Sequence, residues 1–158
     1  MFYQFSLEPE NTWVPLEQTG NLFKNITLVV DVANGSLSEI AATTFRQIGF
    51  GKVIEVNSKL NGNVNLKSGV ADLEDKALIT KEMTQKGIGV FSEHLAVIKL
   101  LELGRKNRTS VAKGDQKICG AVFDADGDRF YRLDYDAARD ALIVTNGDRV
   151  AFFQAKHL

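Results

Sequence analysis

Residues with strand-forming side chains gather in three short runs along the chain, at residues 27–33, 52–57 and 118–123. The first and third runs are almost continuously apolar and contain β-branched side chains. Such runs are typical of strands that are buried on both faces of a sheet, whereas a half-exposed strand alternates polar and apolar residues. The pattern therefore predicts buried central strands at 27–33 and 118–123, with 52–57 as a further strand.

Between the first two runs, apolar side chains recur at the spacing of a helix. They are Leu37, Ile40, Ala41, Thr44, Phe45 and Ile48. Ser36 or Ser38 is suited to cap the start of this helix, and Gly49 is suited to end it. A strand, a helix and a second strand within about 30 residues imply a right-handed parallel crossover, so we predict an α/β domain.

The rest of the chain is assigned by spacing and composition. Residues 73–86 and 93–103 are predicted helices, the second of which ends at Gly104. Residues 130–136 and 141–145 are the predicted arms of a hairpin. The remaining predictions are an N-terminal arm or linker at 1–25, an Asn- and Gly-rich loop at 61–69, a polar linker at 109–117 and a short helix at 149–157.

Composition narrows the class of partner. The chain has 158 residues and a net charge of −1, which gives no electrostatic basis for binding nucleic acid or an anionic membrane. It has no apolar run of membrane-spanning length and no signal peptide, so we expect a cytoplasmic protein. The single cysteine, Cys119, is expected to be a buried packing residue, and His94 to lie on a helix surface or at an interface.

The third predicted strand leads directly into an acidic loop, in which Asp124, Asp126 and Asp128 alternate with Ala125 and Gly127. An extended or curving backbone directs alternate side chains to one side, so the three carboxylates can converge. Carboxylates that converge repel one another unless a cation neutralises them, and oxygen ligands favour Mg²⁺, Ca²⁺ or Mn²⁺. The loop is therefore a candidate site for a divalent metal ion.

Acidic residues at this spacing also occur in other kinds of loop. A solvated acidic turn is the simplest, but the loop lies where a buried strand of an α/β sheet ends, which is the usual edge for ligand sites. An EF-hand requires Gly at position six and Glu at position twelve, where this chain has Arg129 and Tyr135. A haloacid-dehalogenase-like phosphatase matches as far as Gly127 but expects Thr or Ser at Asp128, and it remains an alternative.

Several segments together resemble the second domain of the α-D-phosphohexomutases, the family of phosphoglucomutase and phosphomannomutase. The acidic loop with Arg129 resembles the metal-binding loop of that family. Residues 29–35 look like the opening strand and turn of the domain, 61–65 like its Asn-Gly-rich segment, and 146–148 like the junction to the third domain. The resemblance covers roughly residues 26–157.

The resemblance implies a three-layer α/β/α domain with a mixed four-stranded sheet whose last strand is antiparallel. It also implies a Mg²⁺ ion held by Asp124, Asp126 and Asp128, with Arg129 as a catalytic residue close to a phosphate. That phosphate would belong to a phosphoserine in the first domain of the enzyme. Arginine suits this role because it is always charged and can form paired hydrogen bonds with phosphate.

Enzymes of this family are intramolecular phosphotransferases, a kind of isomerase in carbohydrate metabolism. They interconvert hexose 1-phosphates and 6-phosphates through the phosphoserine and a bisphosphate intermediate. This chain has no segment similar to the family's phosphoserine loop, sugar loop or phosphate loop. We therefore expect a fragment that is inactive alone, with residues 26–145 as the metal-binding domain and 146–158 as the junction and first helix of a following, absent domain. A non-catalytic metal-binding module is the other alternative.

Overall fold

The strand β1 (Ile26–Asp31) lies between β2 (Lys52–Val56) and β4 (Lys117–Phe123), and the three strands are parallel. The computed structural model describes residues 22–156. All but the first residue of β1 are buried, as are five consecutive residues of β4. The predicted strands at 27–33, 52–57 and 118–123 are thus confirmed, including the central position of the first and third.

The antiparallel half of the sheet begins with a hairpin. It consists of β5 (Phe130–Asp136) and β6 (Ala141–Asn146), and β5 pairs with β4. A short strand, β3 (Leu78–Ile79), pairs with the far side of β6 and completes the order β2-β1-β4-β5-β6-β3. The α/β class is confirmed, but the predicted four-stranded sheet is wrong. The sheet has six strands, because both hairpin arms join it and β3 adds a further edge.

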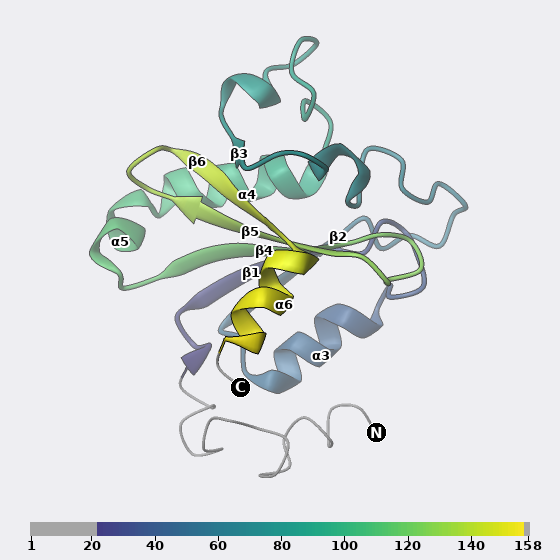
Figure 1. The fold of residues 1–158 in the computed structure, drawn as a ribbon, viewed down its shortest axis with the longest axis horizontal. Helices are drawn as coiled ribbons and strands as arrows, with labels where there is room; N and C mark the ends of the chain where they lie inside the picture. The colour runs from purple at the N-terminus through teal and green to yellow at the C-terminus, as the bar shows by residue number, and fades with distance from the viewer. Residues whose placement is uncertain (1–21, 157–158) are drawn as a thin grey trace.

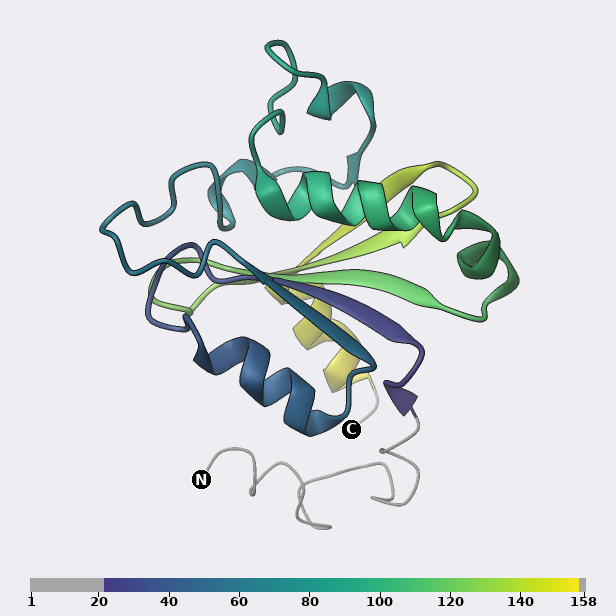
Figure 2. The ribbon, with the colours of Figure 1, turned by 180° about the vertical axis from the view of Figure 1, so that it is seen from behind.

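Helices cover both faces of the sheet (Figure 1). The helix α3 (Ile40–Ile48) lies on one face, with α6 (Gly147–Ala155) on the same side, and α4 (Leu95–Lys106) and α5 (Arg108–Lys113) lie on the other (Figure 2). Two apolar clusters fill the spaces between the layers. The larger lies under α4 and includes Phe91, Leu100 and Leu133, and the smaller lies under α3 and includes Leu28, Val30 and Cys119.

The segment between the Asn-rich loop and α4 differs most from prediction. A helix at 73–86 is wrong: the segment contains two short 3₁₀ turns, η2 (Ala71–Leu73) and η3 (Glu82–Thr84), with β3 between them. Leu73 and Ile79 are both fully buried, so their apolar character reflects separate anchors on the core rather than one helix face. Asp75 also has a positive φ of 60°, which interrupts any helix there.

Several helical boundaries differ from prediction. α3 begins at Ile40 and its N-cap is Glu39, not Ser36 or Ser38, although Gly49 ends it as predicted. α4 continues through the buried Gly104 to Lys106. The helix α5 occupies 109–113 of the predicted linker at 109–117, and Gly114 ends it in a left-handed conformation. Across residues 22–156, none of the helices has the length and apolar character that crossing a bilayer requires.

Candidate metal centre

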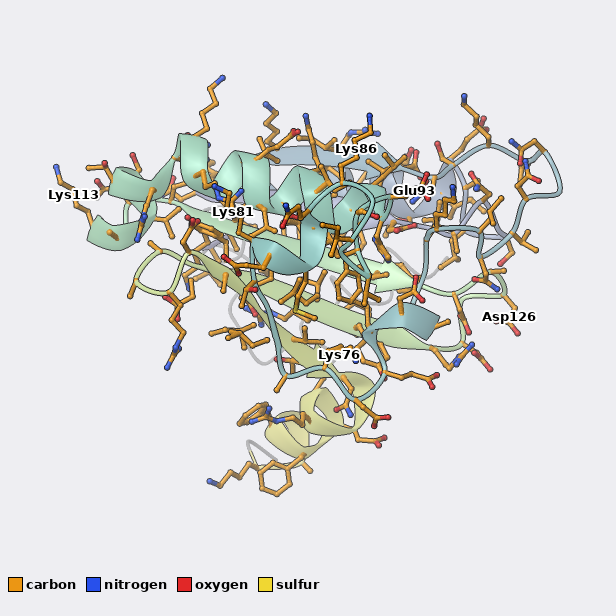
Figure 3. The ribbon with its side chains drawn as sticks, turned by 90° about the horizontal axis from the view of Figure 1, so that it is seen from above. Lys76, Lys81, Lys86, Glu93, Lys113 and Asp126 are labelled. Carbon is orange, nitrogen blue, oxygen red and sulfur yellow. The ribbon has the colours of Figure 1, made fainter. Side chains whose placement is uncertain are left out.

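The acidic loop joins β4 to β5 at the carboxyl end of the parallel strands. The backbone N–H of Asp124 donates to the carbonyl of Arg129 (3.4 Å), which closes the loop, and Gly127 has a φ of 81°. Figure 3 shows Asp126 at the rim of the molecule, at the opposite end from Lys113 of α5. The loop is therefore a tight, exposed turn on a buried strand.

The structure brings the three predicted carboxylates together. One oxygen from each of Asp124, Asp126 and Asp128 lies within 4.8 Å of the others. Asp124 is buried, with 3% of its surface exposed, whereas Asp126 and Asp128 are exposed. One anchored ligand and two accessible ones form a donor set that suits a hard divalent ion, because each offers a carboxylate oxygen.

The loop holds Asp124 in its charged form. Its Oδ1 accepts hydrogen bonds from the backbone N–H groups of Gly127 (3.1 Å) and Arg129 (3.1 Å), and its Oδ2 accepts one from Arg129 Nε (2.8 Å). Burial alone would raise the pKa of Asp124, but the hydrogen bonds from Arg129 outweigh it and lower the pKa to about 2. Asp124 is thus an anion at neutral pH without a bound cation.

The neighbouring carboxylates change the pKa of Asp128 in the opposite direction, upward. A hydrogen bond shared with Asp124, together with repulsion from the charges of Asp126 and Asp124, raises the pKa of Asp128. A raised carboxyl pKa beside other carboxylates indicates that the negative charges of the loop are not fully compensated by the protein. A bound cation would relieve that repulsion, so the electrostatics are compatible with a metal site.

Arg129 bridges two carboxylates from distant parts of the chain. Its Nε donates to Asp124, and its Nη1 donates to Glu74 Oε1 (2.8 Å). Just over half of the Arg129 side chain is exposed, so the guanidinium lies at the border of the loop and solvent. The sequence did not point to Glu74, because it lies 55 residues away in a segment predicted to be helical.

The turn after β1 supports the acidic loop from the neighbouring strand. The backbone N–H of Ser36 donates to the carbonyl of Ala125 (2.8 Å), and its hydroxyl donates to the carbonyl of Asp126 (3.1 Å). Ala33 and Asn34 both have positive φ values, 51° and 55°. Two successive non-glycine residues in the left-handed region are costly, which indicates that the surrounding contacts impose this turn.

A buried polar network lies directly behind that turn. Asp31 is fully buried and accepts hydrogen bonds from the backbone N–H of Ala33 (2.9 Å), the side chain of Asn57 (3.0 Å) and the backbone N–H of Gly69 (3.4 Å). Burial raises the pKa of Asp31, while these hydrogen bonds and the nearby His94 act to lower it. Asp31 therefore fastens β2 and the Asn-rich loop to the end of β1.

His94 belongs to the same network, and the prediction that it lies on a helix surface is wrong. It is 1% exposed, and its Nε2 lies 3.0 Å from the carbonyl oxygen of Gly69. A carbonyl can only accept, so Nε2 carries the proton and donates. Its Nδ1 lies 4.0 Å from Asp31 Oδ2. The sequence did not indicate that His94 lies near Asp31, because Asp31 is 63 positions earlier in the chain.

Comparison with known proteins gives relatives of one kind. The chain is 26% identical over 141 residues to phosphoglucosamine mutase from Pseudomonas fluorescens (strain Pf0-1), a match that covers 89% of this chain and 23% of the relative. It is 27% identical over 135 residues to the enzyme of the same name from Buchnera aphidicola subsp. Baizongia pistaciae (strain Bp), which covers 84% of this chain and 21% of the relative.

A shorter match has higher identity. Phosphoglucosamine mutase from Campylobacter concisus (strain 13826) is 39% identical over 61 residues, or 38% of this chain and 14% of the relative. The chain thus spans less than a quarter of the length of each of these relatives. No protein-family model matches the chain, and no solved structure matches it. The predicted resemblance to phosphohexomutases is confirmed to the extent that these relatives are named as members of that group, at low identity.

Proposed function

We propose that residues 26–145 are the metal-binding domain of a phosphohexomutase and that the acidic loop holds Mg²⁺. The observation that carries the proposal is the convergence of Asp124, Asp126 and Asp128 within 4.8 Å, in a chain similar to phosphoglucosamine mutases. The donor set fits Mg²⁺, which binds proteins through a few carboxylates and completes its coordination with water and substrate phosphates. When bound, Mg²⁺ would supply neutralisation of the charge on a transferring phosphoryl group.

The three carboxylates have different parts in this proposal. Asp124 is the anchored ligand, because it is buried and its low pKa keeps it ionised. Its Oδ1 already accepts two hydrogen bonds, whereas its Oδ2 accepts only the one from Arg129 Nε and keeps a second lone-pair direction for the ion. Asp126 and Asp128 are the accessible ligands, free to adjust as the ion enters.

Arg129 is proposed to contact the phosphoryl group. Its Nη2 forms no hydrogen bond with any residue between 22 and 156, so two N–H donors remain for an anion. A planar guanidinium binds phosphate oxygens through paired, charge-assisted hydrogen bonds. The arginine would thereby orient the phosphoryl group, and its fixed charge would stabilise the negative charge of the transition state.

The activity belongs, in this proposal, to a longer enzyme. Such an enzyme would interconvert a hexose 1-phosphate and a hexose 6-phosphate through a phosphoserine and a bisphosphate intermediate, with the serine supplied by another domain. Residues 146–158 would then lead into the following domain. We expect the purified chain to show no mutase activity alone, and detectable turnover of glucose 1-phosphate or glucosamine 1-phosphate would contradict that expectation.

The haloacid-dehalogenase-like alternative is less well supported. In such a phosphatase Asp124 would be the nucleophile, but both of its oxygens already accept hydrogen bonds from Arg129 or Gly127. A carboxylate that is held in this way and has a pKa of about 2 is a weak nucleophile and a well-placed ligand. A non-catalytic metal-binding module would hold the ion with the same residues but would not respond to phosphate.

Metal binding can be measured by NMR on this chain. Titration with Mg²⁺ should shift the backbone amide signals of residues 124–129, and Asp126→Ala should abolish these shifts. Asp115→Asn is the matched control, because Asp115 is an exposed carboxylate at the other end of β4 and its removal should leave the response intact. The proposal is wrong if the wild-type loop shows no response to tens of millimolar Mg²⁺, both alone and with inorganic phosphate.

A further inference from the structure

The guanidinium of Arg129 is held between two carboxylates that approach it from different elements. Asp124 follows β4 and binds Nε, whereas Glu74 follows the turn η2 and binds Nη1. The two contacts are equally short, at 2.8 Å. Because the acceptors engage different nitrogens, they fix both the position of the guanidinium and the rotation of its plane.

Glu74 is well placed to hold another side chain although it is itself exposed. Its neighbours Leu73 and Val70 are almost completely buried in the core under α4. The turn between them is closed by a hydrogen bond from the N–H of Leu73 to the carbonyl of Val70 (2.9 Å). Gly69, immediately before, donates to the buried Asp31. The backbone at Glu74 is therefore attached to the same buried network that supports the end of β1.

The ion pair between Glu74 and Arg129 contributes little to the stability of the folded domain. Both side chains are just over half exposed, 55% and 52%, and pairs of this kind are screened by solvent. An exposed arginine with a single anchor would, however, sample many rotamers. The second anchor removes that freedom, and a donor that is already ordered loses less entropy when it binds a ligand.

We propose that Glu74 is a positioning residue, which orients Arg129 so that its Nη2 faces a phosphoryl group bound at the acidic loop. The inference rests on the proposed function of that loop and adds to it a residue outside the acidic motif. Nη2 has no acceptor among the described residues, and it is the nitrogen that neither Asp124 nor Glu74 occupies. Glu74 acts through Arg129 and does not itself touch the phosphoryl group.

A competing role for Glu74 predicts the opposite change in phosphate affinity when Glu74 is removed. If the carboxylate merely occupied Arg129 until phosphate displaced it, removal of Glu74 would free the guanidinium and phosphate would bind more tightly. If Glu74 positions Arg129, its removal weakens phosphate binding. The direction of the change therefore separates the two roles.

The test compares Glu74→Ala and Glu74→Gln in the full chain. The alanine variant removes the acceptor, whereas glutamine keeps an oxygen that can accept from Nη1 but has no charge. Asp75→Asn is the matched control: it removes the adjacent charge, and Asn tolerates the left-handed backbone at this position (φ 60°). Arg129→Lys identifies the Nε–H resonance of Arg129, because lysine lacks that group.

The first readout is hydrogen exchange of the Arg129 Nε–H in ¹⁵N spectra without metal. We expect faster exchange in Glu74→Ala, partial recovery in Glu74→Gln and no change in Asp75→Asn. The second readout is the affinity for inorganic phosphate in the presence of Mg²⁺, which we expect Glu74→Ala to weaken about three- to tenfold, with glutamine intermediate. The midpoint of urea unfolding should stay the same in the Glu74 and Asp75 variants.

The outcomes separate the inference from the function on which it rests. If wild type binds Mg²⁺ and phosphate but Glu74→Ala binds phosphate equally well or more tightly, the positioning role is wrong and the proposed function stands. If wild type binds neither, the proposed function fails and the positioning role fails with it. Weaker phosphate binding in Asp75→Asn of the same size as in Glu74→Ala would also overturn the inference, because net charge would then explain the effect.

Discussion

Gly35 lies against the carbonyl of Ala125 so closely that a β-carbon at position 35 would overlap the carbonyl oxygen. The contact joins the turn after β1 to the acidic loop after β4, two segments 90 residues apart. Ser36 strengthens it by donating hydrogen bonds to the carbonyls of Ala125 and Asp126. The path of the acidic loop thus depends on a residue without a side chain in the neighbouring turn.

Gly35→Ala should therefore disturb the acidic loop without touching a carboxylate. The added methyl group must push Ala125 away, which breaks the Ser36 hydrogen bonds and spreads the three aspartates. We expect a loss of stability of about 1–3 kcal/mol, as for other overpacked positions, and at least a several-fold loss of Mg²⁺ affinity. Urea unfolding and the amide shifts of residues 124–129 during Mg²⁺ titration measure the two effects.

Gly114→Ala is the control for this substitution. Gly114 ends the helix α5, nothing lies within 4 Å of the position of an added β-carbon, and it is far from the loop. Its φ of 80° makes alanine unfavourable by roughly 1 kcal/mol. If Gly114→Ala and Gly35→Ala had the same effect on Mg²⁺ affinity, the contact between Gly35 and Ala125 would not be what shapes the site.

Arg129→Met should raise the pKa of Asp124 from about 2 toward its ordinary value of 3.8, because the substitution removes the guanidinium and keeps the side-chain length. A carboxyl whose folded pKa is depressed contributes stability above its unfolded pKa, and that contribution is lost as pH falls through the folded pKa. The variant should therefore lose less stability than wild type between about pH 4 and pH 2.

The ¹³C shift of the Asp124 carboxyl carbon reports the pKa directly, and urea unfolding across the same pH range reports the stability. Arg149→Met is a suitable comparison, since no contact between Arg149 and the acidic loop is present in the described part of the chain. An unchanged Asp124 titration in Arg129→Met would mean that the backbone hydrogen bonds from Gly127 and Arg129 alone hold the carboxylate ionised.

The sequence predicted the parts of the fold in which local pattern and tertiary burial agree. The apolar runs of β1 and β4 are central strands because a strand buried on both faces must be apolar throughout. The acidic loop was also predicted from the sequence, because its three aspartates alternate within five consecutive residues. The helix predicted at 73–86 was wrong because Leu73 and Ile79 are buried separately, and Ile79 belongs to a short strand that pairs with Leu142 of β6.

Contacts between distant residues were beyond what the sequence could give. Glu74 and Arg129 are 55 positions apart, and Asp31 and His94 are 63 apart, so no local spacing links them. Each of these residues taken alone is ordinary: an acidic residue in a polar segment, or a histidine before an apolar run. The sheet and the buried turn at 69–73 bring them together. The residues that support the acidic loop are therefore neighbours only in the folded domain.

Asp31→Ala should be among the more destabilising single substitutions in the chain. It would leave the buried N–H groups of Ala33 and Gly69 and the partly buried amide of Asn57 without their acceptor, and a buried donor left unpaired is costly. We expect a loss of roughly 2–4 kcal/mol in the free energy of unfolding. Asp115→Ala, at an exposed position, should change it by less than about 0.5 kcal/mol.

Hydrogen exchange can localise the effect of Asp31→Ala. The amides of the Asn-rich loop should lose protection before those of β5 and β6, because Asp31 attaches that loop to the end of β1. A uniform loss of protection across the sheet would contradict this, since it would mean that Asp31 supports the whole core rather than the loop behind the acidic site.

Tyr135 should govern part of the alkaline unfolding of the domain. Its hydroxyl donates to Asp140 Oδ1 (2.8 Å), and burial, together with that hydrogen bond, raises the pKa of Tyr135 from 10.0 to about 12. A group whose folded pKa is raised contributes stability that is full below its unfolded pKa and is lost as pH rises through the folded pKa. The wild type should thus lose stability as pH rises from about 10 toward 12.

Tyr135→Phe removes the ionisable hydroxyl and should flatten the decline above pH 10. At neutral pH it should cost only about 1 kcal/mol, because Asp140 keeps its ion pair with Arg105 Nε (3.0 Å). Burial also raises the pKa of Cys119, from 9.0 to about 11, so Cys119→Ala should remove an earlier part of the decline that begins near pH 9. Urea unfolding from pH 8 to 12 separates the two, and a Tyr135→Phe curve parallel to wild type above pH 10 would show that Tyr135 ionises only after the domain has unfolded.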